Sequence, residues 1–209
     1  MKLLIIGASR GIGKVLLQEA LKEDHQVRVL ARNPEKVASS DGRLDLVRGD
    51  VRDQQSLAEA AREMDVVCSC IGVPITFKPV DLFSVAATNL VTLSRQQPEL
   101  KLIAVTGIGA GDSKGHGGFL YDRIFKPLFL KTIYEDKDRE EEIITSSGSN
   151  WLIVRPAGLT NGPRTGNYRV ITDLEGTVAK RISRLDVADF ILSQMVSPTQ
   201  FGQTPLITY

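Results

Sequence analysis

The chain has 209 residues, of which 42% are hydrophobic and 24% are charged, and this ordinary globular composition excludes a disordered chain. The 26 basic and 25 acidic residues leave a formal net charge of +1, which argues against nucleic-acid binding through bulk positive charge. The length favours one domain that spans residues 1–209.

Short apolar runs alternate with longer amphipathic segments in the first half of the chain. Strands are predicted at Leu3–Ile6, Val27–Ala31, Leu44–Val47, Val66–Ile71 and Leu102–Thr106. Helices are predicted at Gly11–Glu23, after Pro34, from an Asp53 N-cap through Met64, and from about Pro79 to Gln97. Such alternation is typical of a parallel α/β sheet that is covered by helices on both faces.

The second half of the chain is less regular. A glycine-rich loop at Gly107–Gly118 precedes a mostly helical segment, Phe119–Ser147, which Pro127 interrupts. A strand at Leu152–Arg155, a helix at Ser183–Val196 and a closing strand at Pro205–Thr208 follow. Between them, Tyr168–Thr172 and Thr177–Arg181 suggest a small hairpin around Glu175-Gly176. These small C-terminal elements are expected on the substrate side of the fold.

Two absences in the sequence bear on location and metal binding. Cys68 and Cys70 are too few for a disulfide framework or a structural zinc site, and no His, Cys and Asp cluster has metal-ligand spacing. The apolar run Leu3–Ile6 is much shorter than the roughly 20 residues that cross a membrane. We expect a cytoplasmic protein with reduced thiols, no metal and no membrane partner.

The strongest signal is a glycine turn between the first strand and the first helix. Its Gly-x-x-x-Gly-x-Gly spacing is a variant of the dinucleotide-binding turn of doubly wound, Rossmann-type sheets. The glycines permit a sharp turn and close approach of a pyrophosphate, which the helix N-terminus attracts. The alternative is a tight turn without a ligand. The turn consists of Gly7, Ala8, Ser9, Arg10, Gly11, Ile12 and Gly13, and Gly13 is expected to let the helix pack closely on the sheet.

The end of the second strand bears on which nucleotide binds. An NAD site has an acidic residue here for the ribose 2′-hydroxyl, whereas this chain has Arg32. A guanidinium is suited to a 2′-phosphate, and Arg10 could reinforce it, so the sequence favours NADP(H) over NAD(H). The alternative is that Arg32 is a solvated loop cation.

Two further strand ends are expected beside the same ligand, because the carboxyl ends of parallel strands meet at one edge. After the third strand, Asp50 could accept from an adenine amino group and Val51 could cover the ring. The alternative for Asp50 is a helix cap, for which Asp53 competes. After the fourth strand, Cys70, Ile71 and Gly72 are expected beside the ribose and pyrophosphate.

These motifs, with the segment Ser147–Pro156 (SGSNWLIVRP), resemble the atypical branch of the short-chain dehydrogenase/reductase superfamily. That branch includes biliverdin-IXβ reductase/flavin reductase proteins and NmrA-like redox sensors. The resemblance covers nearly the whole chain and implies that the residues named above contact NADP(H). It also implies that Val105 and Thr106 face the nicotinamide, and that Pro156, Ala157 and Leu159 border both nicotinamide and substrate.

The chain departs from the superfamily at its proton donor. Other branches use a Tyr-x-x-x-Lys pair, which is missing here. Thr106 is the nearest hydroxyl to the nicotinamide, with a backbone-bonded threonine as the alternative. Lys137 could reach the nicotinamide ribose, although the solvated charge run Glu135–Glu142 is the simpler interpretation. Thr106 and Lys137 are the candidate catalytic residues.

Three functional hypotheses follow. A flavin, quinone or tetrapyrrole can take a proton from water, so the missing tyrosine favours an NADP(H)-dependent reductase of a small planar acceptor. The first alternative is a non-catalytic NADP(H) sensor of the NmrA-like type. The second is a sugar-nucleotide epimerase or dehydratase, for which the C-terminal portion is short. The protein is expected to be a monomer or homodimer, with Phe119–Leu130 as a lid or dimer face.

Overall fold

The computed structural model describes residues 1–37 and 41–209, and its centre is an eight-stranded sheet in the order β3-β2-β1-β4-β5-β6-β10-β8. The strands are β1 (Lys2–Ile6), β2 (Gln26–Ala31), β3 (Leu44–Arg48), β4 (Val66–Ser69), β5 (Lys101–Val105), β6 (Trp151–Pro156), β8 (Arg169–Ile171) and β10 (Leu206–Thr208). Seven strands run parallel, and only β8 is antiparallel to its neighbour β10. The predicted Rossmann-type sheet is confirmed.

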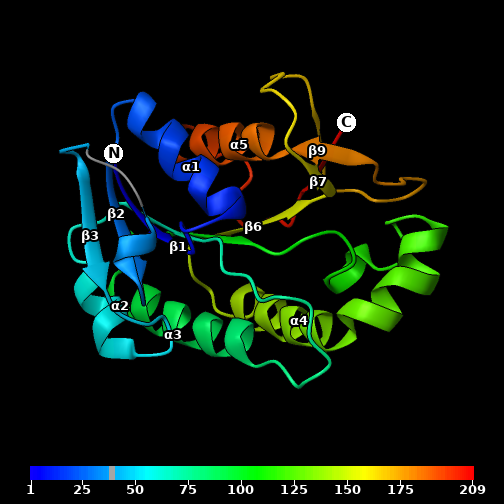
Figure 1. Ribbon diagram of the computed structural model, residues 1–209, viewed down its shortest axis with the longest axis horizontal. Helices are drawn as coiled ribbons and strands as arrows, with labels where there is room; N and C mark the ends of the chain where they lie inside the picture. Colours follow the sequence, from blue (N-terminus) through cyan, green and yellow to red (C-terminus); the bar gives the residue numbers. More distant parts are fainter. Residues whose placement is uncertain (38–40) are drawn as a thin grey trace.

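Helices cover both faces of the sheet (Figure 1). On one face lie α1 (Gly11–Lys22) and α5 (Arg184–Val196), which pack against each other. On the other lie α2 (Gln54–Ala60), α3 (Leu82–Gln96) and α4 (Lys131–Thr145), with α3 and α4 in close contact. Short 3-10 helices at Pro34–Lys36 and Gly111–Ser113 and a π-helix at Tyr121–Leu130 complete the helical segments.

The two faces explain why the strands are apolar at successive positions. Leu3 and Ile5 of β1 pack in the cluster that includes α1 and α5 side chains. Leu4 and Ile6 point the other way, into the cluster with α2 and α3 side chains. Successive strand side chains alternate between faces, so a sheet with helices on both sides must be apolar throughout.

The predicted starts of α2 and α5 are confirmed, whereas α3 begins at Leu82, after the predicted Pro79. Asp53 is the N-cap of α2, and its carboxylate accepts from the backbone N–H groups of Gln55 and Ser56. Ser183 is the N-cap of α5, where its hydroxyl accepts from the Asp186 N–H. The α2 helix ends at Ala60, before the predicted Met64.

The predicted C-terminal hairpin is wrong. The first of its two segments contains β8, which pairs with β10. The second reaches β9 (Arg181–Ser183), which instead pairs in parallel with β7 (Gly158–Thr160) in a separate two-stranded sheet. Glu175-Gly176 does form a turn, with Gly176 at a φ of +65°, but a turn signal does not specify which strands pair.

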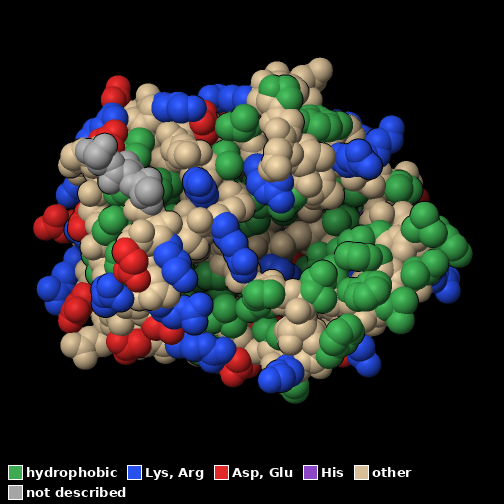
Figure 2. Space-filling model, in the orientation of Figure 1, with side chains coloured by type: hydrophobic (Ala, Val, Ile, Leu, Met, Phe, Trp, Pro, Cys, Tyr) green, Lys and Arg blue, Asp and Glu red, His purple; other side chains and the backbone are tan. Residues whose placement is uncertain are grey.

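The π-helix and its approach carry an exposed apolar surface. Phe119 is 74% exposed, and Leu120, Ile124 and Leu128 are exposed as well. Figure 2 shows these hydrophobic side chains gathered at one end of the molecule. Pro127 lies inside the π-helix instead of ending it. A lid or dimer face at Phe119–Leu130 stays a prediction. No helix in residues 1–37 or 41–209 combines the length and apolarity needed to cross a bilayer.

Candidate functional site

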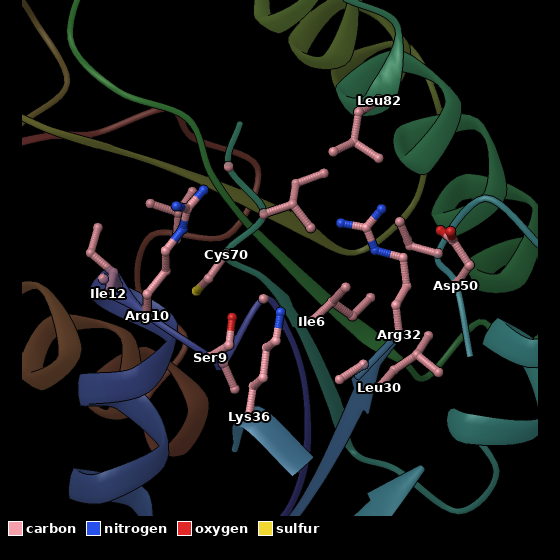
Figure 3. A pocket seen from close by; sticks show the side chains of 18 of the residues that line it. Ile6, Ser9, Arg10, Ile12, Leu30, Arg32, Lys36, Asp50, Cys70 and Leu82 are labelled. Atoms are coloured by element: carbon pink, nitrogen blue, oxygen red, sulfur yellow. The ribbon is translucent and has the colours of Figure 1, made fainter. Parts of the chain in front are cut away.

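A cavity of about 670 Å³ lies at the carboxyl ends of the strands, where the sheet order reverses between β1 and β4. Figure 2 shows the hollow with basic side chains around it, and Figure 3 shows residues of its lining. Most predicted cofactor residues line it: Gly7, Ala8, Ser9, Arg10, Gly11, Ile12, Arg32, Asp50, Val51, Cys70, Ile71, Gly72, Val105, Thr106, Pro156 and Leu159. The predicted strand ends therefore converge.

Each glycine of the turn has its own structural reason. Gly7 has a φ of +92°, and a Cβ there would lie 2.5 Å from the Cys70 carbonyl oxygen. Gly11 has a φ of +63°, and nothing lies within 4 Å of where its Cβ would be, which leaves open space for a ligand. Gly13 does not line the cavity, because it packs α1 onto the sheet: its Cβ would meet the Gly7 carbonyl oxygen at 2.4 Å.

The start of α1 is prepared for an anion. Arg10 is the N-cap in an extended conformation, and no side chain accepts hydrogen bonds at this cap. The first amide groups of a helix have no intrahelical partner and carry the positive end of the helix dipole. A phosphate group beside the turn would therefore supply the missing acceptor.

Three basic side chains face the same part of the cavity. Arg10, Arg32 and Lys36 lie around it in Figure 3, and none of them forms an ion pair within residues 1–37 and 41–209. Arg48 supports this wall: it donates to the Arg32 carbonyl oxygen at 2.9 Å and pairs with Glu35 at 3.0 Å. Lys36 was not predicted from the sequence. The short helix that begins at Pro34 was the available signal, because such a turn returns the chain, and Lys36 with it, toward the end of β2.

Asp50 and Val51 form another wall. The Asp50 carboxylate accepts from the Arg52 N–H at 3.0 Å, whereas Asp53 caps α2, so the interpretation of Asp50 as the helix cap is wrong. Val51 is held in place by Asn89, whose side-chain amide donates to the Val51 carbonyl oxygen at 2.8 Å. Both residues are available to a ring that enters the cavity from this side.

The opposite end of the cavity is lined by the ends of β5 and β6 and by side chains of other elements. Its residues are Val105, Thr106, Lys137, Pro156, Leu159 and Arg184. Ala157 differs from the prediction, since it is 3% exposed and packs in the core without lining the cavity. Thr106 donates its hydroxyl proton to a Glu141 carboxylate oxygen at 2.6 Å, so its partner is an acidic side chain and not the backbone.

Lys137 is buried, and its interpretation as part of a solvated charge run is wrong. It is 7% exposed, its Nζ lies 3.5 Å from the Val105 carbonyl oxygen, and it stands 4.3 Å from the Phe83 ring centroid. The reason is that α4 packs against α3, so one face of a highly charged helix lies inside the protein. Burial lowers the pKa of Lys137 below its ordinary value.

The buried charges on α4 are arranged around Arg155 of β6. The Arg155 guanidinium donates to both carboxylate oxygens of Glu141, at 3.0 and 2.6 Å, and also contacts Asp112. Both Arg155 and Glu141 are buried. This bidentate pair joins α4 to the sheet and fixes the acceptor of the Thr106 hydroxyl, so it holds one wall of the cavity.

Tyr134, three residues before Lys137 on α4, has its partners elsewhere. Its hydroxyl accepts from the Tyr121 hydroxyl at 2.7 Å, and the ammonium of Lys126 lies 4.7 Å from its ring centroid. Burial raises the pKa of Tyr134 well above its ordinary value, so its phenol is a poor proton donor.

Glu140 is a buried acid beside Lys137. It is 1% exposed, its Oε2 lies 3.9 Å from the Lys137 Nζ, and this oxygen has no hydrogen-bond partner among the described residues. Burial raises the pKa of Glu140 to about 8 despite the attraction of the nearby ammonium. The folded protein therefore holds this proton at a pH where the unfolded chain, with a carboxyl pKa near 4.5, has lost it.

This difference gives a pH dependence of stability. A folded-state pKa that is raised stabilises the fold at low pH, and that stability is lost as the pH rises toward 8. We expect the free energy of unfolding of the wild type to fall by at most about 1.4 kcal/mol per pH unit between pH 5 and 8. Glu140→Gln should abolish this decrease. Urea unfolding across this range measures it, with exposed Glu142→Gln as the control. Parallel curves for wild type and Glu140→Gln would contradict the prediction.

No group of His, Cys, Asp and Glu side chains that could hold a metal is found among the described residues. Cys68 and Cys70 are free thiols whose sulfur atoms lie 3.6 Å apart. The cavity itself is lined by the glycine turn at one end, and by the buried ammonium of Lys137 with apolar side chains at the other.

Two relatives match over nearly the whole chain. An uncharacterized chloroplastic protein of Arabidopsis thaliana is 31% identical over 205 residues, covering 93% of this chain and 72% of the relative. A protein of Bacillus subtilis named as an uncharacterized sugar epimerase is 27% identical over 202 residues, covering 93% of this chain and 88% of the relative. The location of this chain stays a prediction.

Solved structures share the fold at low sequence identity. ChuY, an anaerobilin reductase of Escherichia coli O157:H7, has a TM-score of 0.77 at 23% identity, covering 100% of this chain and 97% of that chain. A short-chain dehydrogenase/reductase of Veillonella parvula in complex with NADP has a TM-score of 0.82 at 15% identity, covering 100% and 94%. The family model described as NAD(P)H-binding matches residues 7–198. This chain therefore belongs to the NAD(P)H-binding family, as its resemblance to atypical short-chain dehydrogenases/reductases implies.

Proposed function

We propose that the protein is an NADP(H)-dependent reductase that transfers hydride to a small planar acceptor such as a flavin, quinone or tetrapyrrole. The observation that carries the proposal is one cavity with two chemically different ends. One end has the glycine turn with Arg32 and Lys36, and the other has a buried ammonium beside apolar side chains. A charged dinucleotide and an uncharged ring system suit these two ends.

The preference for NADP(H) rests on the cations at the end of β2. Arg32 and Lys36 line the cavity without carboxylate partners among the described residues, so their donors are available to a 2′-phosphate. The two residues directly after β2, Arg32 and Asn33, are not acidic, so neither supplies a carboxylate to accept from a ribose 2′-hydroxyl. Both features support NADP(H) over NAD(H).

The nicotinamide would supply the hydride, and the residues of the chain would orient it and manage the accompanying proton. In this proposal Pro156 and Leu159 exclude water from one side of the reacting rings. Lys137 is the catalytic residue that faces the ribose and acceptor, because its buried ammonium releases a proton more readily than an exposed lysine. Thr106, whose proton is held by Glu141, positions the ring through its hydroxyl oxygen.

The nature of the acceptor follows from the missing tyrosine. A ketone that accepts hydride forms an alkoxide, which needs a positioned acid of suitable pKa. The phenols of Tyr121 and Tyr134 bond to each other, and burial raises the pKa of both. A flavin or quinone takes its proton from water or from an ammonium, so it suits this cavity better than a simple ketone.

The test is NADPH oxidation, followed by the loss of the near-ultraviolet absorbance of the reduced nicotinamide and corrected for the absorbance of each acceptor. The acceptors are FMN, riboflavin and a benzoquinone, each with NADPH and with NADH. We expect turnover with NADPH, weaker turnover with NADH and no requirement for added metal. Lys137→Met should lower kcat more than it changes the KM for NADPH.

Tight NADPH binding measured by calorimetry, with no turnover on any acceptor, would overturn the proposal and favour the sensor. Turnover of a sugar nucleotide without net NADPH consumption would instead favour the epimerase, a name that the Bacillus subtilis relative carries.

A further inference from the structure

One cation of the cavity is left without a role by the proposed function. Arg184, the first residue of α5, lines the cavity at the end that also contains Leu159 and Pro156. Its guanidinium donates to the Asn161 side-chain oxygen at 2.7 Å, which favours one orientation of the side chain. It forms no ion pair within the described parts of the chain, so most of its five N–H donors are free for a ligand.

The sheet order separates Arg184 from the phosphate end of the cavity. Arg32 follows β2, whereas Arg184 follows β9, whose partner β7 continues from β6. Between β2 and β6 lie β1, β4 and β5, so the two strands are four interstrand spacings, or roughly 19 Å, apart. Arg184 and Arg32 are therefore unsuited to holding the same phosphate group.

Nearby acidic side chains do not neutralise Arg184. Asp186 is occupied by Thr165 and Gly166, and Asp189 pairs with Arg164. Among the residues that line the cavity, Asp50 is the single acidic side chain, and it follows β3 at the opposite end. The acceptor end therefore presents an uncompensated positive charge on an oriented, planar donor.

We infer that Arg184, held by Asn161, is an anion subsite that selects acceptors with a phosphate, sulfonate or carboxylate group attached to the planar ring. This inference rests on the proposed function, because it assumes that the acceptor lies at the Leu159 end. An arginine in a partly closed cavity binds such a group by charge-assisted, bidentate hydrogen bonds. The ring would contact the apolar wall, and the anionic group would reach Arg184.

Two acceptor pairs isolate the anionic group. FMN and riboflavin share one ring system and differ by a phosphate, and a naphthoquinone sulfonate differs from its parent naphthoquinone by a sulfonate. Protein saturated with NADP⁺ is titrated with each member, using flavin fluorescence or calorimetry. The variants are Arg184→Gln and, as a matched control, Arg181→Gln, because Arg181 is exposed on β9 three residues away and does not line the cavity.

We expect wild type to bind the anionic member of at least one pair about 10-fold or more tightly than the neutral member. Arg184→Gln should remove this preference and leave the Kd of the neutral member unchanged, whereas Arg181→Gln should retain it. The preference should also shrink as the salt concentration rises.

The inference is overturned if wild type shows no preference in either pair, if Arg184→Gln keeps the preference, or if Arg181→Gln loses it equally. Displacement of FMN by NADP⁺ would also overturn it, because the flavin would then occupy the cofactor end. Turnover separates the two proposals. If Arg184→Gln oxidises NADPH with neutral acceptors, the reductase proposal is supported whatever the anion preference is. If the wild type oxidises NADPH with no acceptor at all, the reductase proposal is overturned.

Discussion

Replacing Glu141 by alanine is expected to lower the free energy of unfolding by about 3–5 kcal/mol, the cost of leaving a buried charge without its partner. The Arg155 guanidinium would lose both of its Glu141 hydrogen bonds, and its remaining carboxylate, Asp112, is on an exposed side chain. The Thr106 hydroxyl would lose its acceptor as well. For a chain of this size the melting temperature should fall by roughly 6–20 °C.

A second variant distinguishes the effect of the lost ion pair from the effect of lost side-chain packing. Glu141→Leu combined with Arg155→Met removes both charges and retains side-chain volume, and it should recover most of the lost stability. Thermal and urea unfolding of Glu141→Leu, Arg155→Met and the double variant form a double-mutant cycle. Glu142→Ala, an exposed substitution on the same helix, is the control. A double variant as unstable as Glu141→Ala would contradict the ion-pair explanation.

Replacing Arg32 by alanine is expected to raise the KM for NADPH about 10- to 100-fold, the range that loss of charged hydrogen bonds produces. The KM for NADH should stay within about twofold, because NADH has no 2′-phosphate for the guanidinium to bind. Adding Lys36→Ala should weaken NADPH further, since both cations line this end of the cavity. The measurement is steady-state kinetics with both nucleotides and one acceptor.

The control for the nucleotide prediction is Arg62→Ala, which removes an exposed arginine that does not line the cavity. Equal weakening of NADPH and NADH by Arg32→Ala would assign the residue a general structural role. A wild-type protein whose kcat/KM is no higher with NADPH than with NADH would contradict the NADP(H) preference itself.

Local patterns were enough to predict the main sheet and the turn that begins the cavity. The glycine turn, Arg32 and the ends of β3 and β4 could be found because each directly follows an apolar strand. Parallel topology then brings strand ends that are far apart in sequence to one edge. The prediction of a C-terminal hairpin was wrong for the opposite reason. β8 pairs with β10 and β9 pairs with β7, and no local sequence pattern indicates either pairing.

The charged face of α4 could not be interpreted from sequence. Glu135–Glu142 has the composition of a solvated helix, yet Lys137, Glu140 and Glu141 are buried. Their burial depends on partners at distant positions, such as Arg155, and a pattern within the helix carries no information about those partners. Arg184 was missed in the same way, because it reaches the cavity only through the separate β7–β9 sheet.

That separate sheet has a consequence for how such proteins diversify. The walls around the glycine turn follow strands of the eight-stranded sheet, and β1 and β4 at its centre are buried, so a substitution there disturbs many neighbours. Leu159 and Arg184 instead belong to β7 and to the residue after β9, a pair of short strands outside that sheet. Selection can therefore alter the ring-facing end of the cavity while the nucleotide half stays intact, so one inherited scaffold can acquire new substrates through few, local changes.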